Sequence, residues 1–241
     1  LEDGTYEIAE KISLEGKNRF LDVIDGNSDY DTVYLTDDIR GDAFFLHDFF
    51  SDFNANNSNA FVVDIFGDTG TTRMAGVERI IAGDGDDIID LTSPDFVVSN
   101  MEIQGNNGAD VLWGNDGNDI LDGGLGSDIL AGGKGSDLFV IRKGEDAHSY
   151  ELADHIRDFE IGNDSIALSG GLSFDDLKLE VIGSGTDAGK VALLNAANDF
   201  IYTVFDNLSS DDLTLLTQDV FGIYGIDESV SIIFSTVFSR M

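Results

Sequence analysis

The sequence predicts an all-β fold in which a parallel β-roll lies between β-rich capping regions on its N-terminal and C-terminal sides. Two observations predict it: a nine-residue repeat in the middle of the chain, and strand-like alternation of apolar and polar residues on both sides of that repeat. With 241 residues, 42% of them hydrophobic, the chain can bury a substantial core. We expect three parts, at residues 1–76, 77–143 and 144–241.

The N-terminal part, residues 1–76, consists of strand-like segments separated by turns and one long aromatic and acidic loop. The loop reads DDIRGDAFFLHDFFSDFNANNSN. A bare end of a roll would offer unpaired strand edges to other chains, so that end needs an apolar cover. We expect this cover to come from the loop, through Phe44, Phe45, Phe49, Phe50 and Phe53.

The middle part contains four consecutive nonapeptides, each with glycine at the fourth position and aspartate at the sixth. They read GNNGADVLW, GNDGNDILD, GGLGSDILA and GGKGSDLFV, and together they occupy residues 105–140. A separate copy, AGDGDDIID, lies at residues 82–90, and a more divergent copy, GNSDYDTVY, lies at residues 26–34. Four copies in strict phase predict a solenoid, in which each repeat is one structural unit.

Each position of the repeat has a physical reason. Glycine adopts backbone conformations that other residues avoid, so the first six residues form a turn. The last three residues form a short strand, of which only the middle residue points inward. Two nonapeptides therefore complete one coil, and equivalent residues of successive coils stack about 4.8 Å apart. The expected inward residues are Ile89, Leu112, Leu121, Leu130 and Phe139.

The charge of the chain indicates what holds the coils together. The chain has 47 acidic and 13 basic residues, a formal charge of −34, and residues 80–133 contain neither lysine nor arginine. Stacked sixth-position carboxylates repel one another unless a cation lies between them. Ca²⁺ prefers six to eight hard oxygen ligands, which carboxylates and turn carbonyls can supply. The alternative, that these are ordinary polar turns, does not explain the strict nine-residue phase.

The stacking argument also predicts which aspartates are neighbours. Asp110 should stack on Asp128, and Asp119 on Asp137. Asp87 and Asp110 are 23 residues apart, because residues 91–104 form a half-coil lengthened by five residues. We expect its last three residues, EIQ, to remain a strand, and the bulge at residues 94–96 to protrude from the roll.

The nonapeptides resemble the RTX (repeats-in-toxin) family, whose members are exported by bacterial type I secretion systems. Residues 153–179 and 200–222 are similar to the segment that follows the β-roll in serralysin-type proteins, with its D-x-I-x-D-F and G-x-D-x-I-x-L patterns. The resemblance covers residues 82–222. Residues 1–80 look like the ligand-binding modules near the C-terminal end of giant RTX adhesins. The part at residues 144–241 is therefore expected to be a serralysin-like β cap that also holds a possible secretion signal.

The resemblance implies that the sixth-position aspartates and the turn carbonyls bind several Ca²⁺ ions. The candidate ligands lie at the third, fourth and sixth positions of the repeats. They are Asp87, Asp110, Asp119, Asp128 and Asp137 at the sixth position, Asp84 and Asp116 at the third, Gly85, Gly108, Gly117, Gly126 and Gly135 at the fourth, and Asp31 in the divergent copy.

The sequence gives no basis for expecting an enzyme. The three histidines, His47, His148 and His155, share no spacing, and there is no H-E-x-x-H, so the protease activity of serralysins is not carried over. No G-x-S-x-G and no P-loop is present. Asp154 and His155 are expected to lie on a solvent-facing strand of the cap rather than in a catalytic dyad. We therefore expect no catalytic and no cofactor-binding residues.

Two functions fit these features. The first is a calcium-dependent adhesion module of a secreted or cell-surface protein, which binds a peptide or glycan on a host or neighbouring cell. The second is a folding and secretion module that interacts with the type I secretion apparatus and has no ligand of its own. The acidic chain should avoid nucleic acid. No membrane insertion is expected, because the apolar run SVSIIFSTVF is too short for a spanning helix. Trp113 points outward, either as packing against a flanking part or as a ligand contact.

Overall fold

The structure is a computed structural model, and it describes residues 5–7, 24–25, 30–35, 41–46, 74–93, 96–98, 100–216 and 220–223. Within these residues, strands predominate and the helices are two short 3-10 turns, η1 (Tyr150–Leu152) and η2 (Phe174–Asp176). No helix of this part of the chain is long and apolar enough to cross a membrane.

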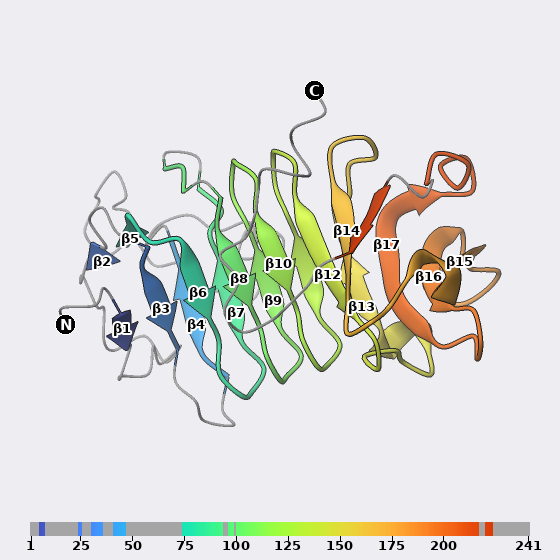
Figure 1. Cartoon of the computed structure of the whole chain (residues 1–241), viewed down its shortest axis with the longest axis horizontal. Coiled ribbons are helices and arrows are strands. Elements are labelled where there is room, and N and C mark those ends of the chain that lie inside the picture. The colour runs from blue at the N-terminus through green and yellow to red at the C-terminus, as the bar shows by residue number, and fades with distance from the viewer. Residues whose placement is uncertain are drawn as a thin grey trace.

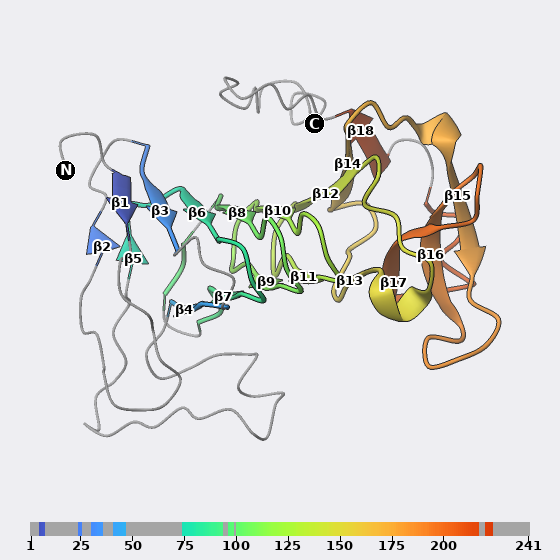
Figure 2. The same cartoon turned by 90° about the horizontal axis from the view of Figure 1, so that it is seen from below.

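Two sheets of eight strands face each other along the length of the molecule, as the two layers in Figure 2 show. Sheet one runs, in spatial order, through β1 (Thr5–Glu7), β3 (Thr32–Tyr34), β6 (Arg79–Ile81), β8 (Glu102–Gln104), β10 (Ile120–Asp122), β12 (Leu138–Arg142), β14 (Ser165–Ser169) and β18 (Phe221–Ile223). Sheet two runs through β4 (Ala43–Phe45), β7 (Ile88–Asp90), β9 (Val111–Trp113), β11 (Ile129–Ala131), β13 (Asp154–Ile156), β17 (Ile201–Ser209), β16 (Lys190–Asn195) and β15 (Leu177–Val181). A separate short pair joins β2 (Ile24–Asp25) to β5 (Met74–Ala75).

The chain alternates between the two sheets and adds one strand to each sheet per coil (Figure 1). β9 pairs in parallel with β11, with Val111 opposite Ile129, and β10 pairs in parallel with β12, with Ile120 opposite Leu138. Each of these pairs is separated by two nonapeptides, as predicted. The all-β fold and the parallel β-roll are therefore confirmed.

The lengthened coil also has the predicted register. Ile88 pairs with Val111 across it, and the strand formed by EIQ is β8, which places Ile103 in the core. The expectation that residue 96 protrudes is wrong, because Phe96 and Val98 pack against the core. Residues 94 and 95 lie outside the described residues. The insertion is held by its own apolar side chains as well as by the strands on either side of it.

A continuous apolar core fills the space between the sheets. The five inward residues predicted from the repeat are all at most 2% exposed: Ile89, Leu112, Leu121, Leu130 and Phe139. Full burial of such a side chain stabilises the folded state by roughly 1.5–3 kcal/mol. The repeat therefore supplies one core side chain per nine residues, which leaves the other positions free for turns.

The core extends beyond the consensus repeats on the N-terminal side. β4 pairs in parallel with β7, which places Phe44 opposite Ile89 and buries it to 2% exposure. Phe44 is thus the inward residue of a further coil, and the expectation that it covers the end of the roll is wrong. Phe45 is half-buried, and Phe49, Phe50 and Phe53 lie outside the described residues.

Parallel strands also continue on the C-terminal side of the repeats. β12 pairs with β14 and β11 pairs with β13, so that both sheets cross the expected boundary at residues 143–144. On the N-terminal side β3 pairs with β6 across the expected boundary at residues 76–77. The division of the chain at these two positions stays a prediction.

The C-terminal end of the roll is closed by antiparallel strands. β17 pairs in parallel with β13, and then β16 and β15 follow it in antiparallel order. Beneath them the rings of Phe139, Phe159 and Phe205 follow one another, with centroids 5.9 and 5.1 Å apart. These antiparallel strands end the series of parallel strands in sheet two. They cover the strand edge on which a further parallel coil could otherwise pair.

One glycine of the turns provides a test of the coil geometry. Gly133 has a φ of +95°, and a Cβ atom there would lie 2.2 Å from the carbonyl oxygen of Asn115 in the preceding coil. Gly133→Ala should lower the free energy of unfolding by on the order of 1–3 kcal/mol, because an L side chain is strained in that conformation. The matched control is Gly183→Ala, where a Cβ atom meets open space. Thermal melts in calcium with equal midpoints for the two variants would contradict the coil geometry.

Candidate calcium sites

The sixth-position residues form two rows along the roll, each beside one sheet. Every member stands at the start of its strand, so the parallel register of the strands stacks the members in line. Row one, at sheet two, consists of Asp42, Asp87, Asp110, Asp128 and Asp154. Row two, at sheet one, consists of Asp31, Glu78, Met101, Asp119, Asp137 and Asp164.

Within each row, a carboxylate accepts a hydrogen bond from the backbone of the preceding coil. The N–H of Asp87 donates to Oδ1 of Asp110 at 2.7 Å, and the N–H of Asp110 donates to Oδ1 of Asp128 at 2.9 Å. In row two the N–H of Asp119 donates to Oδ1 of Asp137 at 2.8 Å. The predicted neighbours Asp110–Asp128, Asp119–Asp137 and Asp87–Asp110 are confirmed.

The second oxygen of most of these carboxylates has no protein partner. Within the described residues, Oδ2 of Asp87, Asp110, Asp128 and Asp137 is buried and accepts no hydrogen bond, and the same holds for both oxygens of Asp31. A buried acceptor left without a partner costs roughly 1–3 kcal/mol, and more when it is charged. Four copies of the same defect in one phase indicate a ligand rather than chance.

Asp119 differs from the other four sixth-position aspartates of the repeats. Its Oδ2 accepts a hydrogen bond from the N–H of Asn115 at 3.0 Å, while its Oδ1 accepts one from the N–H of Met101 at 2.7 Å. Asn115 occupies the second position of its repeat, where three of the five consensus copies have glycine. Its side-chain Nδ2 donates to the carbonyl oxygens of Leu91 and Phe96 in the inserted loop. Asp119 is thus the sixth-position aspartate of the repeats whose two oxygens both accept a hydrogen bond from the backbone.

The carbonyl oxygen of a fourth-position glycine lies close to the fourth-position glycine of the next coil. A Cβ atom at Gly108 would lie 1.7 Å from the carbonyl oxygen of Gly85, and one at Gly126 would lie 1.5 Å from that of Gly108. A Cβ atom at Gly135 would likewise lie 1.6 Å from the carbonyl oxygen of Gly117. Beside these carbonyls lie the carboxylates of the rows, with Oδ1 of Asp110 3.1 Å from the Cβ position at Gly108.

This donor set fits Ca²⁺. It consists of carboxylate and backbone carbonyl oxygens, in turns too tight for a side chain, and calcium takes six to eight such oxygens in flexible geometry. In Asp87, Asp110, Asp128 and Asp137 one carboxylate oxygen accepts a hydrogen bond, and Oδ2 has no protein partner. A bound divalent cation would both satisfy these oxygens and neutralise the repulsion along each row.

The electrostatics of the rows lead to the same conclusion. Burial, together with the charge of neighbouring carboxylates, raises the pKa of Asp110 and of Asp137 to about 8. Burial raises the pKa of Asp87, Asp119 and Asp128 to about 6. Without a cation, part of each row therefore holds protons near neutral pH, and a divalent ion has to displace them to bind.

Sequence reasoning missed the residues that end the rows. Asp154 accepts the N–H of Asp128 at 3.0 Å, and Asp164 accepts the N–H of Asp137 at 2.9 Å. The carboxylate of Asp158 accepts the N–H groups of Gly132 and Gly133, at 3.0 and 2.9 Å. These aspartates belong to the D-x-I-x-D-F and G-x-D-x-I-x-L patterns. Those patterns are the sequence feature from which the ends of the rows could be predicted.

Two features distinguish row two from row one. Met101 occupies a carboxylate position of row two and is 1% exposed, so the row is interrupted there. Beyond the interruption, Oε2 of Glu78 accepts the N–H of Asp31 at 2.8 Å. Row one has a carboxylate in every coil, and the N–H of Asp42 at its N-terminal end donates to Oδ1 of Asp87 at 2.5 Å.

The third-position candidates lie apart from the rows. Asp116 forms an ion pair with Lys134 at 3.0 Å, and its side chain is 44% exposed. Oδ1 of Asp84 accepts a hydrogen bond from Nδ2 of Asn107 at 2.6 Å. Both carboxylates therefore connect the outer sides of adjacent turns.

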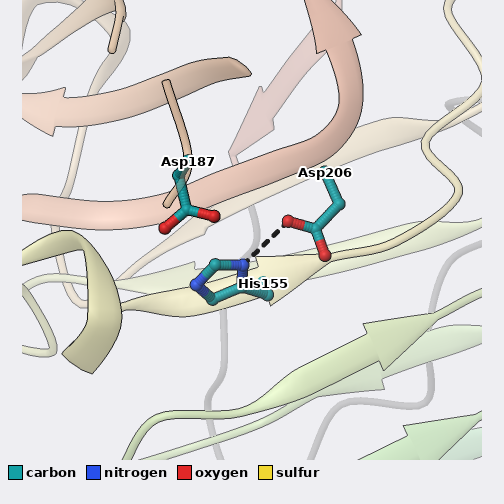
Figure 3. A group of neighbouring side chains, drawn as sticks. All are labelled: His155, Asp187 and Asp206. Carbon is teal, nitrogen blue, oxygen red and sulfur yellow. Dashed lines mark hydrogen bonds and ion pairs between the residues drawn. The ribbon is translucent and has the colours of Figure 1, made fainter. Parts of the chain in front are cut away.

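A second group of titratable side chains lies where β13 meets the antiparallel hairpin (Figure 3). Nδ1 of His155 is 2.8 Å from Oδ1 of Asp206, and Nζ of Lys190 is 2.6 Å from the same oxygen and 2.8 Å from Oδ1 of Asp187. Although burial acts to raise it, hydrogen bonds from His155 and Lys190 hold the pKa of Asp206 at about 2. The ammonium group of Lys190 already serves as the cation of this group.

The remaining histidines show no catalytic arrangement in the described residues. The carboxylate of Asp154 belongs to row one, whereas His155 pairs with Asp206, so the two neighbours form no dyad. The ring of His148 packs edge-on against Phe200, with centroids 4.1 Å apart. His47 lies outside the described residues.

The comparison with protein-family models agrees with this geometry. Residues 74–91 and 104–139 match the family model of the RTX calcium-binding nonapeptide repeat, in four copies. Among solved structures, the chain is similar to the AlgE6R3 subunit of the Azotobacter vinelandii mannuronan C5-epimerase, determined in solution. That likeness has 27% identity and a TM-score of 0.36, and it covers 58% of this chain and 91% of the subunit. No curated protein is similar enough to count as a match.

The matched residues belong to the central coils and include β5, β6, β7, β9, β10 and β11. They carry the glycine turns, the inward apolar residues and the buried aspartate rows that the repeat requires. RTX nonapeptide repeats bind calcium, and this chain therefore has several Ca²⁺ sites. The nonapeptides of the central coils are thus RTX calcium-binding repeats, and the coils that they build form a parallel β-roll.

Proposed function

We propose that this chain is an extracellular adhesion module that becomes folded and rigid when it binds Ca²⁺. The observation that supports the proposal best is the series of buried Oδ2 atoms without a protein partner. A roll with these oxygens unsatisfied and a formal charge of −34 is unfavourable, whereas the same roll with divalent ions is not. Metal binding is in such a case coupled to folding.

The proposed ligands are the sixth-position carboxylates together with the turn carbonyls that meet them. The carboxylates are those of Asp87, Asp110, Asp119, Asp128 and Asp137, with Asp31 in the outer coil of row two, and the carbonyls are those of Gly85, Gly108, Gly117, Gly126 and Gly135. We assign Asp84 and Asp116 to the outer surface of the turns, because their carboxylates already bind Asn107 and Lys134.

The calcium requirement fits a protein that works outside the cell. Extracellular calcium modules have dissociation constants of roughly 10⁻⁴–10⁻³ M, a range matched to their surroundings. In a compartment poor in calcium the acidic chain would stay unfolded, which is the state suited to passage through a type I secretion apparatus. Once outside, the chain would meet calcium and fold.

The proposed role after folding is binding, and not catalysis. The resemblance of residues 1–80 to ligand-binding modules of RTX adhesins supports a peptide or glycan ligand on a host or neighbouring cell. The competing candidate is a folding and export module without a ligand. It is favoured by the serralysin-like cap, whose Asp154 and Asp164 end the two carboxylate rows.

Removal of calcium should unfold the chain in a way that depends on pH. The row carboxylates have pKa values raised above the ordinary value, so their protonation stabilises the metal-free fold. That stabilisation is complete below about pH 4 and is lost as the pH rises through about 6 to 8. Chelated protein should lose its β circular-dichroism signal at pH 8 and regain part of it near pH 4.

The control for this experiment is the calcium-loaded chain, which should keep the same spectrum at pH 8. Mg²⁺ in place of Ca²⁺ should restore little structure, because Mg²⁺ demands a compact octahedral site and gives up its waters reluctantly. An unchanged spectrum and melting temperature after complete chelation at pH 8 would remove the physical basis of the proposal.

Substitution of a single row carboxylate should reduce the number of bound ions. Asp110→Asn keeps the acceptor for the N–H of Asp87 but removes a charged oxygen from row one. It should lower the calcium content, measured by mass spectrometry on the dialysed protein, by at least one ion per chain. Asp116→Asn is the matched control, and it should leave the content unchanged. Equal calcium content in both variants would mean that the buried rows are not the ligands.

Adhesion and export can be separated with two preparations. The calcium-loaded chain should bind cells, glycan arrays or peptide libraries, and EDTA should abolish the binding. A fusion of residues 144–241 to a passenger protein tests export by the cap alone. Export of this fusion, together with no calcium-dependent binding by the whole chain, would favour the second candidate over adhesion.

A further inference from the structure

A polar pocket of about 240 Å³ lies on the outer face of sheet one, apart from the carboxylate rows. Its wall comes from β8, β10 and β12, through Gln104, Asp122 and Arg142. Each of the three follows an inward core residue of its strand, so it points to the outer face. The residues Asn107, Leu125 and Glu145, which follow these strands, also line the pocket.

The charged groups of the pocket hold one another in place. Nη1 and Nη2 of Arg142 donate to the two carboxylate oxygens of Asp122, which form the two-pronged contact that fixes a guanidinium plane. Oε2 of Glu145 accepts the backbone N–H of Arg142 at 3.1 Å, and its other oxygen is 3.6 Å from Nη1. The guanidinium is thus positioned before any ligand arrives, while the side chain of Arg142 stays 27% exposed.

The charge balance of the pocket excludes an anionic ligand. Arg142 is already paired with two carboxylates, although its guanidinium has more N–H groups than the two that bind Asp122, and the whole chain carries a formal charge of −34. Burial raises the pKa of Glu145 to about 7, so near neutral pH this group is partly protonated and can both donate and accept hydrogen bonds. The remaining pair, Asp122 and Arg142, has no net charge.

The amides supply oriented acceptors. Nε2 of Gln104 donates to Glu102 at 2.7 Å, and Nδ2 of Asn107 donates to Asp84 at 2.6 Å. These contacts fix both amide groups and leave their oxygens as acceptors. Beside them, Leu125 is 55% exposed and offers an apolar surface at the rim.

We propose that this pocket binds one neutral, polyhydroxylated residue of a glycan. Hydroxyl groups can donate to the amide oxygens and accept from the guanidinium, and the C–H face of a sugar ring can pack on Leu125. Pockets for drug-sized ligands have volumes of roughly 300–1,000 Å³, so this smaller pocket suits a single sugar unit. This inference rests on the proposed adhesive role. It adds to that role the chemical class of the ligand and the position of the binding site.

The experiment uses the whole chain in calcium. The probe is a glycan array with neutral and sialylated glycans, followed by calorimetric titration with the neutral oligosaccharide that binds best. Leu125→Asp and Gln104→Ala should each weaken binding at least tenfold. Leu125→Asp is compatible with the fold, because aspartate holds the same repeat position at Asp116. The matched control is Lys134→Ala, at the same position of a repeat outside the pocket, and it should bind as the unsubstituted chain does.

Three results would overturn the inference: no neutral glycan bound by a chain that circular dichroism shows to be folded, binding of sialylated glycans alone, or binding that survives both pocket variants. Binding of peptides or cells without any glycan binding would leave the adhesive role standing and remove only this pocket. Loss of calcium-dependent folding would instead remove the proposed function itself.

Discussion

The structure depends on a carboxylate whose two oxygens have different roles. One oxygen accepts an N–H group from the neighbouring coil and so sets the distance between coils. The other oxygen is buried without a protein partner and needs a cation. The two roles depend on each other, because the hydrogen bonds bring the carboxylates together and a cation or, at low pH, protons have to offset their repulsion. The core packing, the turn geometry and the net charge of the chain are all compatible with cations bound along the carboxylate rows.

Most of the central coils could be predicted from the sequence, because the repeat fixes position and chemistry together. Aspartate at the sixth position and a large apolar residue at the eighth were sufficient to place Asp110, Asp128 and Leu112. The five-residue insertion did not disturb the prediction, since a strand must return in phase to bury Ile103. The outer coils could not be predicted in the same way. The residues before Asp42 lack the glycine spacing, so the sequence predicts Phe44 as a surface cover, whereas it lies in the core.

The same limit explains why the ends of the rows were missed. Asp154, Asp158 and Asp164 do in the cap what the repeat does in the roll, but they reach the backbone from segments without nine-residue periodicity. A repeat predicts the role of a residue from its position within the nonapeptide. The residues that end the rows lie outside the nonapeptides, so the repeat does not predict them. The ion pairs of Lys190 with Asp187 and Asp206 are also invisible in sequence, because they join residues from different strands and turns of the cap.

The methionine in row two has a consequence for how the molecule assembles. The buried side chain of Met101 supplies no carboxylate oxygen to row two, although the N–H of Met101 still donates to Oδ1 of Asp119 at 2.7 Å. If ions occupy the rows as proposed, row one offers a carboxylate at each strand from β4 to β13, whereas row two lacks one at this coil. Any link through bound ions between the coils on either side of Met101 would therefore depend on the carboxylates of row one.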